Sequence, residues 1–102
     1  MSNATDYTHI VAYRMYEVGY THIEFHEARS GLNITATDPY IRKVAVVCRY
    51  NEQRPVHSGA VREAMELKER ENCSWAIVAS HNGYTDEARA LAKENNVMLW
   101  KV

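Results

Sequence analysis

The sequence predicts an α/β protein, a three-layer α/β/α sandwich around a mixed five-stranded sheet, with its elements in the order α-β-β-β-α-β-α-β. Two observations lead to this fold class. Three strand-like segments follow one another with no helix between them, and such strands can pair antiparallel through short turns. Each of two later strand-like segments follows a helix-like segment, and a helical crossover joins strands that lie parallel.

The first half of the chain predicts one helix and three strands. Residues 6–18 have helical spacing, and Gly19 suits the left-handed cap at a helix end. The apolar side of this helix comprises Ile10, Val11, Tyr13, Met15 and Val18. Residues 20–26 and 32–37 alternate between apolar and polar side chains, as half-buried strands do. Residues 44–50 form the most apolar strand, which we expect to lie at the centre of the sheet.

The second half of the chain alternates helices with strands. A proline precedes the helix predicted at residues 58–70. The stripe of this helix that we expect to be buried comprises Ala60, Val61, Ala64, Met65 and Leu67. Residues 75–79 are a short apolar run, typical of a strand that is covered on both faces. Thr85 is a good N-cap for the next helix, which ends before a last strand at residues 97–102.

The bulk properties are those of one small globular domain. The chain has 102 residues, of which 46% are hydrophobic and 25% charged. We expect a single domain over residues 5–102 and interpret residues 1–4 as the remnant of an expression tag. The formal net charge of -1 argues against a dedicated DNA-binding protein, which usually carries a basic excess. Any contact with nucleic acid would therefore need a local basic patch.

Cellular location is predicted from cysteine usage and hydropathy. Cys48 and Cys73 lack the CxxC spacing and predict reduced thiols in a cytoplasmic protein. No apolar run approaches the roughly 20 residues that a membrane-spanning helix needs, so we expect no contact with a membrane.

A series of short phrases extends over residues 7–102. Gly19-Tyr20 follows the first helix, Arg54-Pro55-Val56 leads into the second, and the phrases AVREAMELK and GYTDEARALAKENNV lie in the second and third helical regions. Each phrase is weak by itself. Together and in this order they resemble the Mrr-type branch of the restriction-endonuclease-like nucleases, the PD-(D/E)XK group. This resemblance implies a nuclease fold whose active site combines an aspartate after a Gly-x turn with a Glu/Gln-x-Lys pair on the next strand.

At the positions where the resemblance places the active site, this chain has other residues. The aspartate position is Asn33, the Glu/Gln position is Val47 and the lysine position is Arg49. The resemblance also implies an additional glutamate on the first helix, and the corresponding position in this sequence is near Thr8. Such nucleases use carboxylates to hold Mg²⁺, which activates water. An amide is a poorer ligand, valine is none, and arginine stays protonated. We therefore expect a degenerate site without catalytic residues, metal or other cofactor.

Three functions stay open at this point. The first is a catalytically inactive domain that binds DNA, or a protein partner in a DNA-processing or defence system, through the former active face. The second is an active, divergent Mg²⁺-dependent DNA endonuclease in which a relocated carboxylate restores the metal site. The candidates for this acid are Glu27, Glu52, Glu63 and Glu66. The third is a protein-interaction or regulatory subunit that keeps only the fold.

The candidate nucleic-acid contacts are basic residues in segments that we expect to flank one edge of the sheet. They are Arg29, Arg42, Lys43, Arg49 and Arg54. Arg49 lies inside an apolar strand, where a charge needs a partner. A bound phosphate would serve, as would an internal carboxylate such as Glu63, and we favour the internal pair. The last strand contains Trp100 and predicts an apolar sheet edge, which suggests a homodimer contact there.

The histidines do not predict a metal site. His22 and His26 share one face of a strand but would stand about 13 Å apart, too far to hold one ion. His57 and His81 each lie at the end of an element, where we expect capping or exposed side chains.

Overall fold

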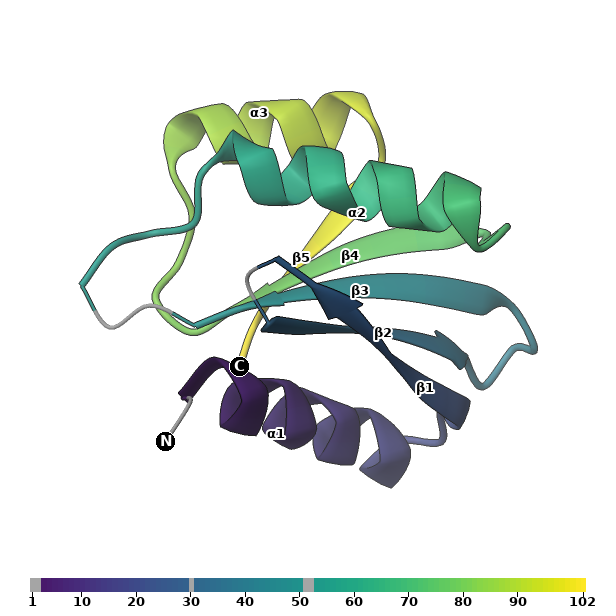
Figure 1. Cartoon of the computed structure of the whole chain (residues 1–102). Coiled ribbons are helices and arrows are strands. Elements are labelled where there is room, and N and C mark those ends of the chain that lie inside the picture. The colour runs from purple at the N-terminus through teal and green to yellow at the C-terminus, as the bar shows by residue number, and fades with distance from the viewer. Residues whose placement is uncertain (1–2, 30, 51–52) are drawn as a thin grey trace.

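The computed structural model describes residues 3–29, 31–50 and 53–102, and its elements follow the predicted order (Figure 1). Their bounds are α1 (Asn3–Glu17), β1 (Thr21–Ala28), β2 (Gly31–Thr37), β3 (Lys43–Arg49), α2 (Ser58–Arg70), β4 (Trp75–Ser80), α3 (Asp86–Glu94) and β5 (Val97–Lys101). The start of α1 lies three residues before its predicted position, within the segment interpreted as a tag remnant. The other bounds agree with the prediction to within two residues.

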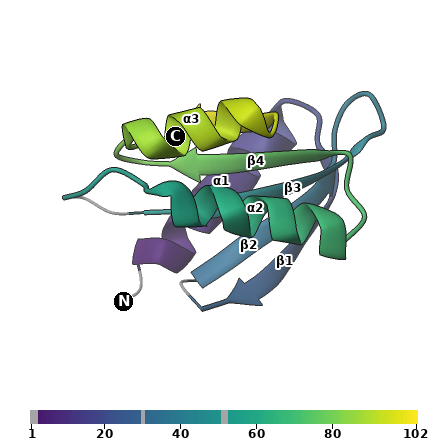
Figure 2. The ribbon, with the colours of Figure 1, turned by 90° about the horizontal axis from the view of Figure 1, so that it is seen from above.

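The five strands form one mixed sheet in the order β1-β2-β3-β4-β5, which confirms the predicted fold class. β1, β2 and β3 pair antiparallel, whereas β3, β4 and β5 pair parallel through the crossover helices α2 and α3. β3 is the central strand, as its apolar sequence predicts. α1 covers one face of the sheet, and α2 and α3 cover the other (Figure 1). Viewed from the side of α2 and α3, these helices lie next to each other, and the β1–β2 hairpin extends beyond α2 (Figure 2).

Alternation along β3 gives the protein two small cores, one on each face of the sheet. Val44, Val46 and Cys48 belong to the core beneath α1, whereas Ala45 and Val47 belong to the core beneath α2 and α3. All five are buried because successive side chains of a strand point to opposite faces and both faces are covered. This double burial explains why the segment reads as one continuous apolar run.

The crossover helices begin and pack as their sequences predict. The side chain of Thr85 caps α3 by accepting a hydrogen bond of 3.1 Å from the backbone N–H of Ala88. Four residues of the predicted stripe of α2 are buried, and Met65 is half-buried against the same core. The four are Ala60, Val61, Ala64 and Leu67.

The buried face of α1 differs from the predicted one. Ile10, Tyr13 and Val18 are 51%, 63% and 66% exposed. The residues that pack on the sheet are Tyr7, Thr8, Val11, Ala12 and Met15. They follow the three- and four-residue spacing of one helical stripe, whereas the predicted set spread around most of the helix.

Gly19 ends α1 as predicted. Its φ of +100° is left-handed, and its N–H donates to the carbonyl of Tyr16 while the N–H of Tyr20 donates to the carbonyl of Met15. These two bonds form a Schellman motif, which satisfies carbonyls that a helix end otherwise leaves unpaired. Among the described residues, no helix combines the length and the apolar character that crossing a membrane requires.

Candidate functional site

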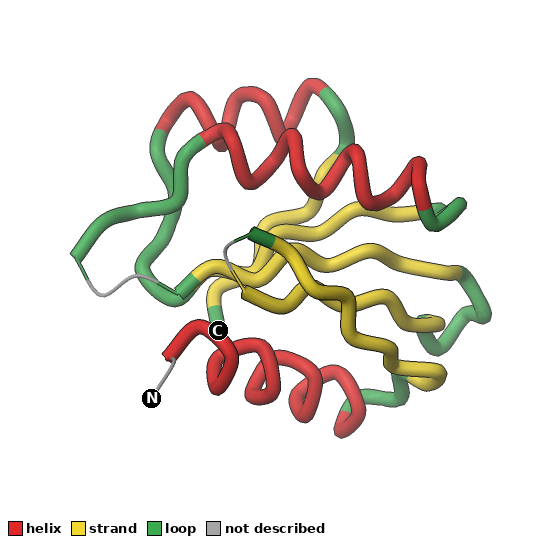
Figure 3. Tube along the Cα trace, in the orientation of Figure 1, coloured by secondary structure: helices red, strands yellow, loops and turns green. Residues whose placement is uncertain are grey.

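One edge of the sheet gathers the segments that the resemblance associates with catalysis. Arg49 at the end of β3 pairs with Ser80 at the end of β4, and the strand register places the start of β2 at the same edge. The loops that follow β3 and β4 leave this edge together (Figure 3). They are joined where the N–H of Val56 donates to Gly83 and the N–H of Thr85 donates to Val56, each over 2.9 Å. Ligands of open α/β sheets bind at the carboxyl ends of the strands.

The three degenerate positions converge on the face of the sheet that α2 covers. The pairing of Ile34 with Val46 brings Asn33 and Val47 onto neighbouring strands with the same orientation. Arg49 lies two residues after Val47 and points the same way. Asn33 is only 2% exposed, and Val47 is fully buried in the core beneath α2. The three positions that the resemblance assigns to the active site therefore share one face of the sheet.

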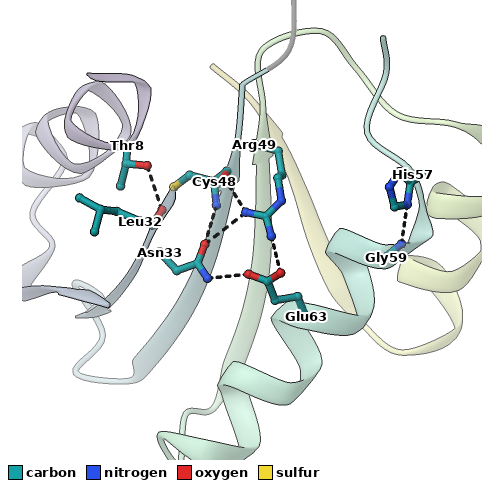
Figure 4. Close-up of polar contacts among 8 residues, drawn as sticks. All are labelled: Thr8, Leu32, Asn33, Cys48, Arg49, His57, Gly59 and Glu63. Atoms are coloured by element: carbon teal, nitrogen blue, oxygen red, sulfur yellow. Dashed lines mark hydrogen bonds and ion pairs between the residues drawn. The ribbon is translucent and has the colours of Figure 1, made fainter. Parts of the chain in front are cut away.

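Glu63 of α2 completes this cluster (Figure 4). Its Oε2 accepts a hydrogen bond of 2.7 Å from Nδ2 of Asn33, and its Oε1 forms an ion pair with Nη2 of Arg49. Nη1 of Arg49 donates to the carbonyl of Cys48 over 2.8 Å and lies 3.5 Å from Oδ1 of Asn33. The Oδ1 atom also accepts the N–H of Cys48 at 3.3 Å. The expected internal pair between Arg49 and Glu63 is confirmed.

The charges of this network balance internally. Partial burial would raise the pKa of Glu63, but the hydrogen bonds from Arg49 and Asn33 and the charge of Arg49 outweigh that cost and lower the pKa below its ordinary value. Glu63 is therefore ionised at neutral pH, and its charge is matched by the guanidinium group. Each of its oxygens already accepts one hydrogen bond, so a metal ion would compete with Asn33 and Arg49 for this carboxylate.

Thr8 has a structural role in this fold. It is fully buried, and its hydroxyl donates a hydrogen bond of 2.9 Å to the carbonyl of Leu32, which ties α1 to β2. The thiol of Cys48 lies nearby, and burial raises the pKa of this thiol to about 12. The position to which the resemblance assigns an additional glutamate thus holds a neutral contact between α1 and the sheet.

Glu27 and Glu66, two of the other candidate acids, do not reach this cluster. Glu27 pairs with Leu32, so it points to the opposite face of the sheet from Asn33. Glu66 lies with Arg62 on the exposed surface of α2. Glu52 falls outside the described residues. No group of three or more histidine, cysteine, aspartate or glutamate side chains in the described ranges could hold a metal ion. Within the described part of the chain, the donor set therefore does not fit the Mg²⁺ site that the resemblance implies.

An open cleft of about 470 Å³ lies beside the network, between the end of β3 and the start of α2. Arg49, Arg54 and His57 line it together with the first turn of α2. His57 caps α2, as expected of a histidine at the end of an element, because its Nδ1 accepts a hydrogen bond of 3.0 Å from the N–H of Gly59. A Cβ atom on Gly59 would come within 2.6 Å of the His57 ring, so only glycine leaves room for this cap. The signal in the sequence for this arrangement is a glycine, Gly59, two residues after His57.

The five candidate basic residues do not form one patch. Arg29 follows β1 at the same edge as Arg49 and Arg54, but Lys43 pairs with Thr37 at the opposite end of β3. The expectation that Arg42 and Lys43 join the others is wrong because a seven-residue strand separates their ends of the sheet by about 20 Å.

Arg42 is instead part of the turn between β2 and β3. Its Nε donates a hydrogen bond of 3.0 Å to Asp38, and its guanidinium lies 5.1 Å from the ring of Trp75. Burial would raise the pKa of Asp38, but the backbone N–H groups of Arg42 and Tyr40 and the Arg42 side chain lower it overall. Arg42 therefore stabilises the turn at the edge remote from the cleft.

Comparisons with known proteins agree with this architecture. The chain superposes on EndoMS in its apo form with a TM-score of 0.75 and 15% sequence identity, and on a repair endonuclease from Pyrococcus abyssi with a TM-score of 0.71 and 18% identity. All of this chain but only 47% of each of those chains is covered, so it spans about half their length. A protein of unknown function, AF1548, gives a TM-score of 0.74 at 12% identity, over 95% of this chain and 57% of its own.

Comparison of the sequence with individual proteins and with family models gave different results. A search of curated proteins found no match. The family model Mrr_cat, described as restriction endonuclease, matches residues 2–102. Because this match extends over nearly the whole sequence, the chain belongs to the Mrr_cat restriction endonuclease family.

Proposed function

We propose that this protein is a catalytically inactive restriction-endonuclease-like domain that binds DNA at the edge of the sheet where the family's active site lies. The observation that carries the proposal is the network of Asn33, Arg49 and Glu63, which occupies the family's metal-binding position with groups that satisfy one another. DNA cleavage in this family needs carboxylates that hold a metal ion and a group that activates water. Among the residues that the structure describes, the carboxylate in this network, Glu63, is paired with Arg49.

The residues around the cleft support DNA as the ligand. Arg54 and His57 are exposed and line the cleft with Arg49, and Arg29 lies at the same edge. The first turn of α2, which faces the cleft, contains no acidic residue. Backbone N–H groups at a helix start favour phosphate. A protein with a net charge of -1 would need such a local arrangement to bind a polyanion.

Two measurements test this proposal. Plasmid DNA incubated with Mg²⁺ or Mn²⁺ should show no nicking even at high protein concentration. Fluorescence anisotropy with labelled duplex DNA should show binding that weakens as salt rises, because each phosphate contact releases counterions. Arg54→Ala should lower the slope of log affinity against log salt by about 1. The matched control is Lys93→Ala on α3, which removes one charge outside the cleft and should leave the slope unchanged.

The outcomes separate the candidate functions. Metal-dependent nicking would establish an active, divergent endonuclease with a relocated acidic ligand. Absence of salt-sensitive DNA binding would move the assignment to a protein-interaction or regulatory subunit. The outer surface of α1 favours that second candidate, because its exposed apolar side chains form a surface of the kind that partners cover. They are Ile10, Tyr13, Tyr16 and Val18.

A further inference from the structure

Three aromatic rings cluster on the α1 side of the sheet, next to the cleft. The rings of Tyr50 and His81 stack with centroids 5.0 Å apart and an interplanar angle of 30°. Tyr7 of α1 lies beneath them, 5.6 Å from Tyr50 and 6.1 Å from His81. These residues line a second open pocket of about 400 Å³ together with Asp6 and Arg14.

The cluster is only partly a core feature. Tyr7 is 3% exposed and forms the floor, whereas Tyr50 is half-buried and His81 is exposed. Nδ1 of His81 lies 3.2 Å from the carbonyl of Val102, which fixes the orientation of the ring. Aromatic rings held in place at a surface offer π-faces to a flat ligand. The volume lies within the range of about 300–1,000 Å³ that small-molecule sites occupy.

Tyr50 connects this pocket to the arginine cleft. It directly follows Arg49 at the end of β3 and lines both hollows. Arg49 and Arg54 line the first of these hollows, and Arg14 lines the second. A nucleic-acid strand whose phosphates contact the arginine cleft would carry its neighbouring base towards Tyr50 and His81.

We infer that this pocket, defined by Tyr7, Tyr50 and His81, binds an unpaired nucleobase, so that the protein prefers single-stranded or locally unpaired DNA to intact duplex. The inference rests on the proposed DNA binding and specifies its substrate class. Bases in a duplex are already stacked and paired, whereas an unpaired base can stack on an aromatic side chain. The Asp6 carboxylate adds an acceptor for the N–H groups of a base, and Arg14 adds a positive charge for the adjoining phosphate.

The test compares single-stranded and duplex oligonucleotides in fluorescence anisotropy at low salt. Wild-type protein should bind the single strand more tightly. Tyr50→Leu and His81→Leu should each weaken single-strand binding by about 5- to 100-fold and change duplex binding by less than about twofold. Tyr50→Phe keeps the π-face and should retain binding. Tyr13→Leu is the matched control, because Tyr13 is an exposed tyrosine of α1 outside the pocket.

A second readout reports on stacking itself. A single strand that contains 2-aminopurine should lose fluorescence on binding to wild-type protein and recover it with His81→Leu. His81 is exposed, so this variant tests the pocket even if Tyr50→Leu fails to fold. Duplex binding that equals single-strand binding and is unaffected by either variant would overturn this inference alone. Absence of binding to both kinds of DNA would overturn the proposed function as well.

Discussion

Glu63 of α2 accepts a hydrogen bond of 2.7 Å from the side-chain amide of Asn33 on β2, which joins the helix to a strand that is not its direct neighbour in sequence. The same carboxylate pairs with Arg49 on β3. One acidic side chain thus connects α2, β2 and β3 at two of the positions that the resemblance assigns to the active site.

Removal of one partner of the ion pair should destabilise the fold. Arg49→Met leaves the Glu63 carboxylate partly buried without its counter-charge. Arg49 is 18% exposed and Glu63 33%, so solvent reduces the cost to about 1–3 kcal/mol, below that of a fully buried pair. The double variant Arg49→Met, Glu63→Leu should recover most of the loss. Urea unfolding of the two single variants and the double variant measures the coupling energy, which should exceed about 1 kcal/mol.

A control variant for this comparison of single and double variants is available on α2, the helix that contains Glu63. Arg62→Ala removes an exposed arginine that bonds to Ser58 within α2 and should change stability by less than about 0.5 kcal/mol. Additive effects of the Arg49 and Glu63 variants would contradict an energetic role for the network.

Stability should fall in acid because of Glu63. Its pKa in the folded protein lies below the ordinary value of 4.5, so the unfolded chain binds a proton more readily. The stabilisation is therefore fully present above about pH 4.5 and is lost as the pH falls through the lower pKa of the folded state. Thermal unfolding followed from pH 7 to pH 3 should show a steeper loss for the wild type than for Glu63→Gln.

A second carboxylate serves as an internal comparison in the thermal-unfolding experiment between pH 7 and pH 3. Asp38 also has a lowered pKa, so its contribution should persist in Glu63→Gln and leave a residual slope. Parallel curves for the wild type and Glu63→Gln would show that Glu63 does not contribute to the pH dependence.

A single substitution should create a metal-sensitive variant. Asn33→Asp places a second carboxylate against Glu63, at atoms that are now 2.7 Å apart, and the repulsion should cost about 1–2 kcal/mol at neutral pH. Mn²⁺ or Mg²⁺ would neutralise such a pair, because carboxylate oxygens are the ligands that these ions prefer. The Tm of Asn33→Asp should rise with millimolar Mn²⁺, whereas the Tm of the wild type should stay constant. A wild-type Tm that rises as much as that of the variant would refute the assignment of a degenerate site.

The exposed edge of the sheet should mediate dimer formation. β5 pairs with β4 on one side, and within the described ranges no strand pairs with its other side. Met98 on this strand is 40% exposed. We predict a homodimer in light scattering at micromolar concentration, and Met98→Lys should give the monomer mass because charge on an edge strand opposes pairing. Tyr13→Ser on α1 is the control and should leave the dimer intact.

A monomeric wild-type protein would contradict the edge contact. Loss of the dimer in Tyr13→Ser alone would assign the interface to the outer surface of α1 instead of β5.

Sequence reasoning located most of the fold because local signals agreed with one another. The apolar run of β3, the Thr85 cap and the Gly19 turn each depend on near neighbours in the chain. It failed for the buried face of α1, where apolar residues lie almost all around the helix. Ile10 is as apolar as Val11, and only the position of the sheet decides which of them is covered.

For the candidate site, too, the sequence predicted some features and the tertiary structure decided the others. The order of the phrases identified Asn33, Val47 and Arg49 as the family's active-site positions, and the burial cost of a charge indicated that Arg49 needs a partner. The sequence named Glu63 as one candidate among several acids, and the register of β1 and the packing of α2 selected it. The basic patch was mispredicted because residues close in sequence, such as Lys43 and Arg49, lie at opposite ends of one strand.

The sequence by itself thus determined the order of the elements and the family, since both follow from residue types and local spacing. The tertiary structure alone decided which acid pairs with Arg49, which arginines share an edge, and that Tyr7, Tyr50 and His81 meet beside the cleft. Those relationships join residues 14 to 74 positions apart. Contacts at such separations depend on sheet register and helix packing, which no local pattern specifies.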